Sequence, residues 1–218
     1  SSKGGRSIIG AGVRPLTILQ IRGTSGSGKT TLVRQVLNLA PAKDTMYLKG
    51  RKNPYFYRLK FRDHIITVPG SYVSECGGAD TVKTYDELYA IIKQEHAAGH
   101  DVLFEGLLCA HDGKRSRDLW EHLGRDPVLF MILELTDPLE VCLASVEKRR
   151  AGRKNPPKTA FNPDNTIRRY KEVQRSCEQL EALGIPIHRH RRDEAVTVAL
   201  QLLKLPVMVT EEASFLLL

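Results

Sequence analysis

The interpretation of this chain depends on Gly23-Thr24-Ser25-Gly26-Ser27-Gly28-Lys29-Thr30, a stretch that fits the pattern G-x-x-x-x-G-K-T. Residues 16–21 before it form a short apolar run with β-branched side chains, which predicts a buried strand. After it, apolar residues recur at helical spacing as far as Leu39, so we expect a helix that begins at Lys29. A strand, a glycine-rich loop and a helix in this order indicate a loop that binds phosphate.

The residue types in this loop suit a nucleoside triphosphate with magnesium. Glycines let backbone N–H groups turn toward a phosphate without a Cβ clash, and the helix N-terminus adds partial positive charge there. We expect Lys29 to bridge the β- and γ-phosphates and the Thr30 hydroxyl to bind Mg²⁺. The alternative is a glycine-rich turn with an unrelated lysine. The candidate ATP-binding residues are Gly23, Thr24, Ser25, Gly26, Ser27, Gly28, Lys29, Thr30 and Thr31.

A carboxylate for the same site is predicted at the end of the apolar stretch 101–106. The run ends in Glu105 followed by a glycine, which is where a Walker B carboxylate belongs in this kind of sheet. Glu105 would hold Mg²⁺ together with Thr30, or would orient the acceptor. The alternative is a strand that merely ends in a glutamate.

The loop at 70–81 is glycine-rich and follows a predicted strand at 64–69. In an α/β sheet, a loop that leaves the carboxyl end of a strand beside the phosphate-binding loop lies over the site. Transfer to a hydroxyl group needs a carboxylate within hydrogen-bond reach to accept the proton. Asp80 and Glu75 in this loop are the candidate bases, and Glu105 also qualifies on sequence alone.

The overall charge points to a polyanionic partner. The 218 residues carry a formal net charge of +8, more than a protein that handles only small free nucleotides needs. The alternative is a solvated basic surface. No apolar run approaches a transmembrane length, so we expect no membrane partner. Four scattered cysteines without a C-x-x-C pair favour free thiols in a reducing cytoplasm.

A second basic feature, residues 51–62, interleaves cations with aromatic rings. Such a surface can grip phosphates and stack on bases. The alternative is a half-buried edge strand with its basic residues outward. The residues expected to contact DNA, from this segment and the loop after it, are Arg51, Lys52, Tyr55, Tyr57, Arg58 and Tyr72.

A third basic segment, 148–158, carries six positive charges in eleven positions and is broken by glycine and two prolines. This composition predicts a mobile loop. Arginines on such a loop can close over phosphates and neutralise transition-state charge, so Arg149 and Arg153 are candidate catalytic residues. A grip on nucleic acid and a solvated linker are the alternatives.

Strands expected near 16–22, 64–69, 101–105, 128–135 and 185–190, with helices between them, predict an α/β fold with a five-stranded, parallel, doubly wound sheet. We expect a flexible arm at 1–15, one domain at 16–204 with a mobile basic lid at about 148–162, and a tail at 205–218. Thr84, the segment 136–138 and Asp193 are expected to cap the helices that follow them, and 46–50 to add a short strand.

Together, the loop at 23–31, the stretch 101–106 and the helix running from 136–138 into Arg149, Arg150 and Arg153 resemble the small P-loop kinases of the nucleoside-monophosphate-kinase-like class. The resemblance implies the P-loop kinase fold, ATP and Mg²⁺, lid arginines, and contact of Arg192 with adenine.

Within that class, the loop from Gly70 to Asp80 is similar to that of bacteriophage kinases that phosphorylate 5-hydroxymethyluracil in DNA. This implies DNA with a modified pyrimidine as partner and, for a phage-encoded protein, the cytoplasm of an infected bacterial host. A kinase of free deoxynucleoside monophosphates or nucleosides, and a nucleic-acid-binding NTPase, stay open as alternatives, as does the oligomeric state.

Overall fold

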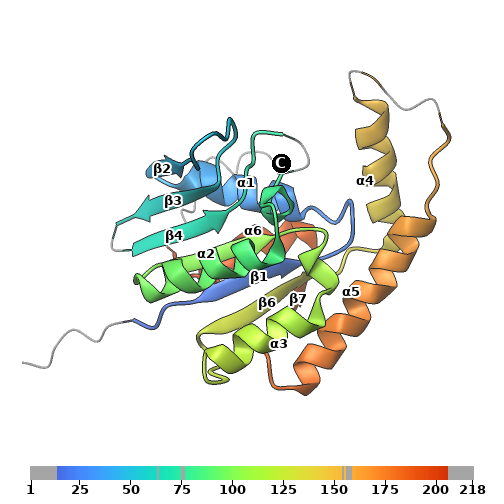
Figure 1. Cartoon of the computed structure of the whole chain (residues 1–218). Helices are drawn as coiled ribbons and strands as arrows, with labels where there is room; N and C mark the ends of the chain where they lie inside the picture. Colours follow the sequence, from blue (N-terminus) through green and yellow to red (C-terminus); the bar gives the residue numbers. More distant parts are fainter. Residues whose placement is uncertain (1–13, 63, 75–76, 154, 156–158, 206–218) are drawn as a thin grey trace, which may run out of the picture.

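A seven-stranded mixed sheet forms the centre of the protein, in the order β2-β3-β4-β5-β1-β6-β7 (Figure 1). The computed structural model describes residues 14–62, 64–74, 77–153, 155 and 159–205. The strands are β1 Ile18–Arg22, β2 Ala42–Met46, β3 Phe56–Phe61, β4 His64–Pro69, β5 Asp101–Glu105, β6 Phe130–Leu135 and β7 Ile187–His190. The helices are α1 Lys29–Leu39, α2 Tyr85–Ala97, α3 Gly113–His122, α4 Leu139–Ala151, α5 Asp164–Ala182 and α6 Arg192–Leu202, with the 3-10 turns η1 Ala79–Thr81 and η2 Cys109–His111.

The five strands expected from the sequence all lie in this sheet and are mutually parallel, in the order β4-β5-β1-β6-β7. The expectation of a five-stranded sheet is nevertheless wrong, because β2 and β3 extend it as an antiparallel hairpin beside β4. The strand expected at 46–50 is wrong, because β2 ends at Met46 and residues 47–50 form no strand. Most of β2 is exposed, so it lacks the apolar alternation that identifies a strand.

Alternation along the central strands divides the core into two layers, and helices cover both faces of the sheet (Figure 1). Leu19 and Ile21 of β1 face α1 and α6, whereas Ile18 faces the side covered by α2, α3 and α5. Burying each strand on both faces is typical of parallel sheets flanked by helices.

Helix capping follows the sequence at one of the three expected positions. The Thr84 side chain accepts a hydrogen bond from the backbone N–H of Glu87 at 3.1 Å and starts α2, as predicted. No side chain caps α4, because the Asp137 carboxylate accepts hydrogen bonds from Arg192 instead. Asp193 lies inside the first turn of α6, whose N-cap is Arg191, so it does not cap the helix.

Several expectations concern residues outside the described part of the chain. The arm expected at 1–15 lies largely there, since the description begins at residue 14, and so does all but the first residue of the expected tail. Cys109, Cys142 and Cys177 are buried free thiols, whereas Cys76 lies outside the described residues. Within the described residues, no helix has both the length and the apolar character needed to span a bilayer.

One buried carboxylate joins the hairpin to the rest of the sheet. Glu95 of α2 accepts two hydrogen bonds from Arg58 of β3, both at 2.8 Å, and a third from the Thr67 hydroxyl of β4 at 2.7 Å. His100 contacts the same carboxylate at 2.9 Å. Burial raises the pKa of Glu95, but the hydrogen bonds from Arg58, Thr67 and His100 outweigh it and bring the pKa to about 2.

We expect Glu95→Gln to lower the free energy of unfolding by about 2 kcal/mol at pH 7, because a charge-assisted network is lost. A carboxyl with a lowered folded-state pKa contributes stability that is present above its ordinary pKa and lost as pH falls through the folded value. The difference between wild type and variant should therefore shrink between about pH 4.5 and pH 2. Denaturant titrations at several pH values check this. The exposed Glu121→Gln is the control, and an equal pH dependence in wild type and Glu95→Gln would contradict the prediction.

Candidate active site

The candidate site lies at the carboxyl edge of the parallel strands, where β1 leads into α1 through the glycine-rich loop (Figure 1). A pocket of about 660 Å³ opens there. Its walls come from the loop and first turn of α1, from Glu105 at the end of β5, from Asp80 in η1, and from α4. Ligands of open α/β sheets bind at this edge, beside the strand where connections diverge to the two faces.

The glycine-rich loop packs closely against α4 and has donor groups without a partner among the described residues. Gly26 has φ +79°, and a Cβ there would lie 3.1 Å from the carbonyl carbon of Cys142 and closer still to its oxygen. No side chain caps the first turn of α1, so its N–H groups are left for another acceptor. The buried Ser27 hydroxyl has no hydrogen-bond partner among the described residues. These unsatisfied donors fit a phosphate group.

Lys29 contributes a positive charge to the floor of the pocket. Its ammonium group donates hydrogen bonds to the carbonyl oxygens of Gly23 at 2.7 Å and Thr24 at 2.9 Å. Burial lowers the pKa of Lys29, while the nearby carboxylates of Glu105 and Asp80 raise it. The lysine is thus held inside the loop, with acidic groups facing it.

Thr30 and Glu105 lie side by side. The Thr30 hydroxyl donates a hydrogen bond to Glu105 Oε1 at 3.1 Å. Burial raises the pKa of Glu105 to about 7, although Lys29 and Thr30 lower it. A hydroxyl and a carboxylate oxygen together suit Mg²⁺, which is commonly held by one or two protein oxygens plus substrate phosphates. Across the described residues there is no cluster of three His, Cys, Asp or Glu side chains that would form a complete protein cage.

Asp80 is fixed against the end of β5. One of its carboxylate oxygens accepts a hydrogen bond from the backbone N–H of Leu107 at 2.6 Å, and the other accepts one from Leu108 at 3.1 Å. Asp80 is exposed and lines the same pocket as Glu105 and Lys29. Of the three carboxylates considered as bases, the structure brings Asp80 and Glu105 together, and Glu75 lies outside the described residues.

The loop that carries Asp80 approaches Glu105 more closely than any residue other than glycine would allow. Ser71 and Gly78 form an antiparallel bridge that closes the loop, with the Gly78 N–H donating to the Ser71 carbonyl at 2.8 Å. Gly78 has φ +96°, and a Cβ there would lie 2.9 Å from Glu105 Cδ and closer still to Oε1. The glycine pair at 77–78 is the sequence signal for this contact.

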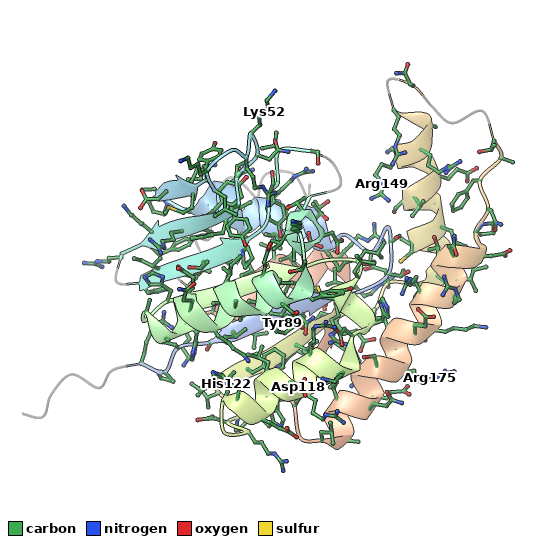
Figure 2. All side chains as sticks on the ribbon, viewed as in Figure 1. Lys52, Tyr89, Asp118, His122, Arg149 and Arg175 are labelled. Atoms are coloured by element: carbon green, nitrogen blue, oxygen red, sulfur yellow. The ribbon has the colours of Figure 1, made fainter. Side chains whose placement is uncertain are left out.

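The basic segment after α4 reaches the pocket only in part. Lys148 and Arg149 line it, and Arg149 extends from α4 toward the body of the protein (Figure 2). Its Nε is buried and has no hydrogen-bond partner among the described residues. Arg153 is exposed and is not on the pocket wall, whereas 154 and 156–158 lie outside the description.

Arg192 has a role that the sequence did not reveal. Its guanidinium donates to Asp137 Oδ1 at 2.9 Å, to the Ser145 hydroxyl at 3.0 Å and to the Gly26 carbonyl at 2.9 Å. It therefore lines the pocket while bracing the glycine-rich loop, and its donors are engaged by protein groups instead of being directed at a nucleobase. Arg34 was also missed, and it reaches from α1 to the carbonyl oxygens of Tyr72 and Ser74.

The expected DNA-contacting tyrosines lie inside the protein. Tyr55, Tyr57 and Tyr72 are each less than a tenth exposed and pack in the two core layers. All three rings are enclosed by other parts of the protein, so stacking of these rings on bases is not supported. Arg58 is held by Glu95, whereas Lys52 is exposed at the end of the hairpin (Figure 2).

The fold and the site define an α/β protein with a polar, charged pocket at the carboxyl edge of its central sheet. No family model matches the chain. A 5-hmdU DNA kinase of Pseudomonas phage PaMx11 is 38% identical to it over 188 residues, which cover 86% of this chain and 97% of that protein. A 5-hmdU DNA kinase of Bacillus phage SP10 is 25% identical over 173 residues, 78% of this chain but 26% of that longer protein. The chain belongs to the family of phage 5-hmdU DNA kinases.

We expect Gly78→Ala to destabilise the protein more than Gly99→Ala does. Both glycines have similar positive φ values, +96° and +91°, so both substitutions strain the backbone by about 1–3 kcal/mol. Only the Cβ on residue 78 meets Glu105, whereas nothing lies within 4 Å of the one on residue 99. Thermal unfolding and ATP titration of both variants test this, with weaker ATP binding expected for Gly78→Ala alone. Equal effects of the two substitutions would contradict the role given to this contact.

Proposed function

We propose that this chain is an ATP-dependent P-loop kinase that phosphorylates the hydroxymethyl group of 5-hydroxymethyluracil in phage DNA. The observation that carries the proposal is 38% identity along 97% of a phage 5-hmdU DNA kinase. The pocket in which the glycine-rich loop, Lys29, Thr30 and Glu105 meet supports phosphoryl transfer as its chemistry. The reaction would take place where the DNA is, in the cytoplasm of the infected host.

Residues 23–31 would hold the triphosphate of ATP, with the N–H groups of the first turn of α1 and Lys29 compensating its charge. Thr30 and Glu105 would hold Mg²⁺, and the buried Glu105 carboxyl must be ionised to do so. When bound, MgATP supplies the phosphoryl group and a cation that neutralises charge on its oxygens. Lys148 and Arg149 of α4 line the open side of the pocket and would stabilise negative charge on the transferring group.

Asp80 is the proposed general base. It would accept the proton of the hydroxymethyl group as the hydroxyl oxygen bonds to the γ-phosphorus and the bond to the β-phosphate oxygen breaks. Two backbone N–H groups hold the Asp80 carboxylate in one orientation, which favours a fixed position for the acceptor hydroxyl. A base in duplex DNA would have to leave the helix to reach this pocket.

The proposed lid comprises residues 148–162, and its described part lines the pocket with two basic side chains. Lys148 and Arg149, at the end of α4, are the groups that would act on the nucleotide. Arg153 would act only if the segment moved toward the pocket, since it lies off the pocket wall. We also propose that residues 16–204 form one domain that includes this segment.

Transfer of label from γ-labelled ATP with Mg²⁺ is the direct test of the acceptor. Matched oligonucleotides with thymine or 5-hydroxymethyluracil at one position are compared with the free monophosphates. We expect label only in the 5-hydroxymethyluracil oligonucleotide, and none with Lys29→Ala. Label only in a free nucleotide would identify a metabolic kinase and overturn the proposal. ATP hydrolysis without any labelled acceptor would favour a nucleic-acid-binding NTPase.

The role of Asp80 is tested by Asp80→Asn. An amide keeps an acceptor for one backbone N–H but cannot take up the proton, so we expect kcat to fall at least a hundredfold while ATP affinity changes little. Steady-state kinetics and ATP titration separate the two. Substitution of the half-exposed Asp118 of α3, which pairs with Lys114, by Asn serves as control. Unchanged kcat in Asp80→Asn would remove Asp80 as the base, and parallel losses in ATP affinity and thermal stability would indicate a structural role.

A further inference from the structure

The β2–β3 tip, residues 47–55, exposes an aromatic and an aliphatic side chain next to each other. Tyr47 is 58% exposed and Leu48 is 44% exposed. Lys49 and Lys52 are also exposed on this tip, the latter at its outer end (Figure 2). Single exposed apolar residues are common on protein surfaces, but this pair is bordered by cations. A ring and lysines in this combination suit stacking on a base with contacts to the neighbouring phosphates.

The sheet topology places the tip at the same edge as the candidate active site. β2 is antiparallel to β3, and β3 is antiparallel to β4, so β2 runs in the direction of the five parallel strands. The chain therefore leaves β2 at the carboxyl edge of the sheet, where the glycine-rich loop and the end of β5 also lie (Figure 1). A molecule that spans this edge can reach both the tip and the pocket.

Arg51 fixes the tip to the turn that carries Asp80. Its guanidinium donates to the carbonyl oxygen of Thr81 at 2.8 Å and lies over the ring of Tyr55, 5.3 Å from the centroid. The backbone N–H of Arg51 donates a hydrogen bond to the carbonyl oxygen of Leu48 at 3.0 Å, which closes the tip. Thr81 is the residue after Asp80 in η1. The exposed side chains of the tip are thus held in place relative to the proposed base.

The charge around the tip is strongly one-sided. Residues 41–62 contain seven lysines and arginines and one acidic residue, Asp44, which pairs with Lys60 at 2.8 Å. This distribution favours a polyanion and disfavours a partner with a neutral or basic surface. Part of the net charge of +8 is therefore located in this segment.

We infer that the β2–β3 tip is a DNA contact, in which Tyr47 stacks on a base beside the target nucleotide and Lys49 and Lys52 contact phosphates. This inference rests on the proposed function. A target base that leaves the helix exposes the faces of its neighbours, and an inserted or stacked side chain compensates for the contacts that they lose. Leu48, beside Tyr47, adds apolar surface at the same point.

Binding of a fluorescent duplex with one 5-hydroxymethyluracil, measured by anisotropy without ATP, tests the inference apart from catalysis. We expect Tyr47→Ala to weaken binding about tenfold and Tyr47→Phe to bind like wild type, because stacking needs the ring and not the hydroxyl. The double variant Lys49→Ala, Lys52→Ala should reduce the slope of log affinity against log salt concentration by about two. Leu183→Ala, of similar exposure at the opposite edge, and Lys60→Ala, at the other end of the hairpin, are the controls.

Each outcome bears on one claim. Wild-type affinity in Tyr47→Ala and an unchanged salt slope in the lysine variant would overturn the inference, even if the enzyme phosphorylates DNA. Loss of binding in the two control variants to the same extent would overturn it as well, because the effect would not be local to the tip. Absence of label transfer to DNA in the wild type would overturn the proposed function instead. Thermal unfolding of all variants verifies that they are folded.

Discussion

The guanidinium group of Arg192 holds together the segments that meet at the pocket. It binds the Asp137 carboxylate that precedes α4, the Ser145 hydroxyl within α4, and the Gly26 carbonyl of the glycine-rich loop. A planar group with several fixed donors can satisfy these three acceptors at once, which an ammonium group would do less well. The position of α4, and with it that of Arg149, therefore depends on the same side chain that braces the loop.

The central sheet and the first helix could be predicted because their signals are local. The apolar run before Gly23, the helical spacing after Lys29 and the Thr84 cap each lie within a few neighbouring residues, and the structure agrees with all three. The pairing of Asp137 with Arg192 could not be predicted, because it joins residues 55 positions apart and each has an ordinary local alternative. The side-chain cap expected from the segment 136–138 is absent for this reason.

The β2–β3 hairpin could be predicted from the sequence only in part, for a different reason. The interleaved basic and aromatic residues of 51–62 predicted either a nucleic-acid surface or a half-buried edge strand, and only the three-dimensional packing distinguishes them. The rings of Tyr55 and Tyr57 lie in the core. The exposed ring is that of Tyr47, which precedes the basic and aromatic segment 51–62. β2 escaped detection because an exposed edge strand has no apolar face to produce a pattern.

The edge strands β2 and β7 determine whether the sheet can pair with the sheet of a second copy. An unpaired strand edge invites backbone hydrogen bonding with a second chain, which leads to aggregation. β2 is exposed and carries Lys43 and Asp44, the latter paired with Lys60, so a second strand would have to displace charged side chains. At the other margin, β7 has four residues and its Arg189 is engaged by Glu134 and Glu181. Charge on one margin and short length on the other both oppose pairing of strand edges between copies.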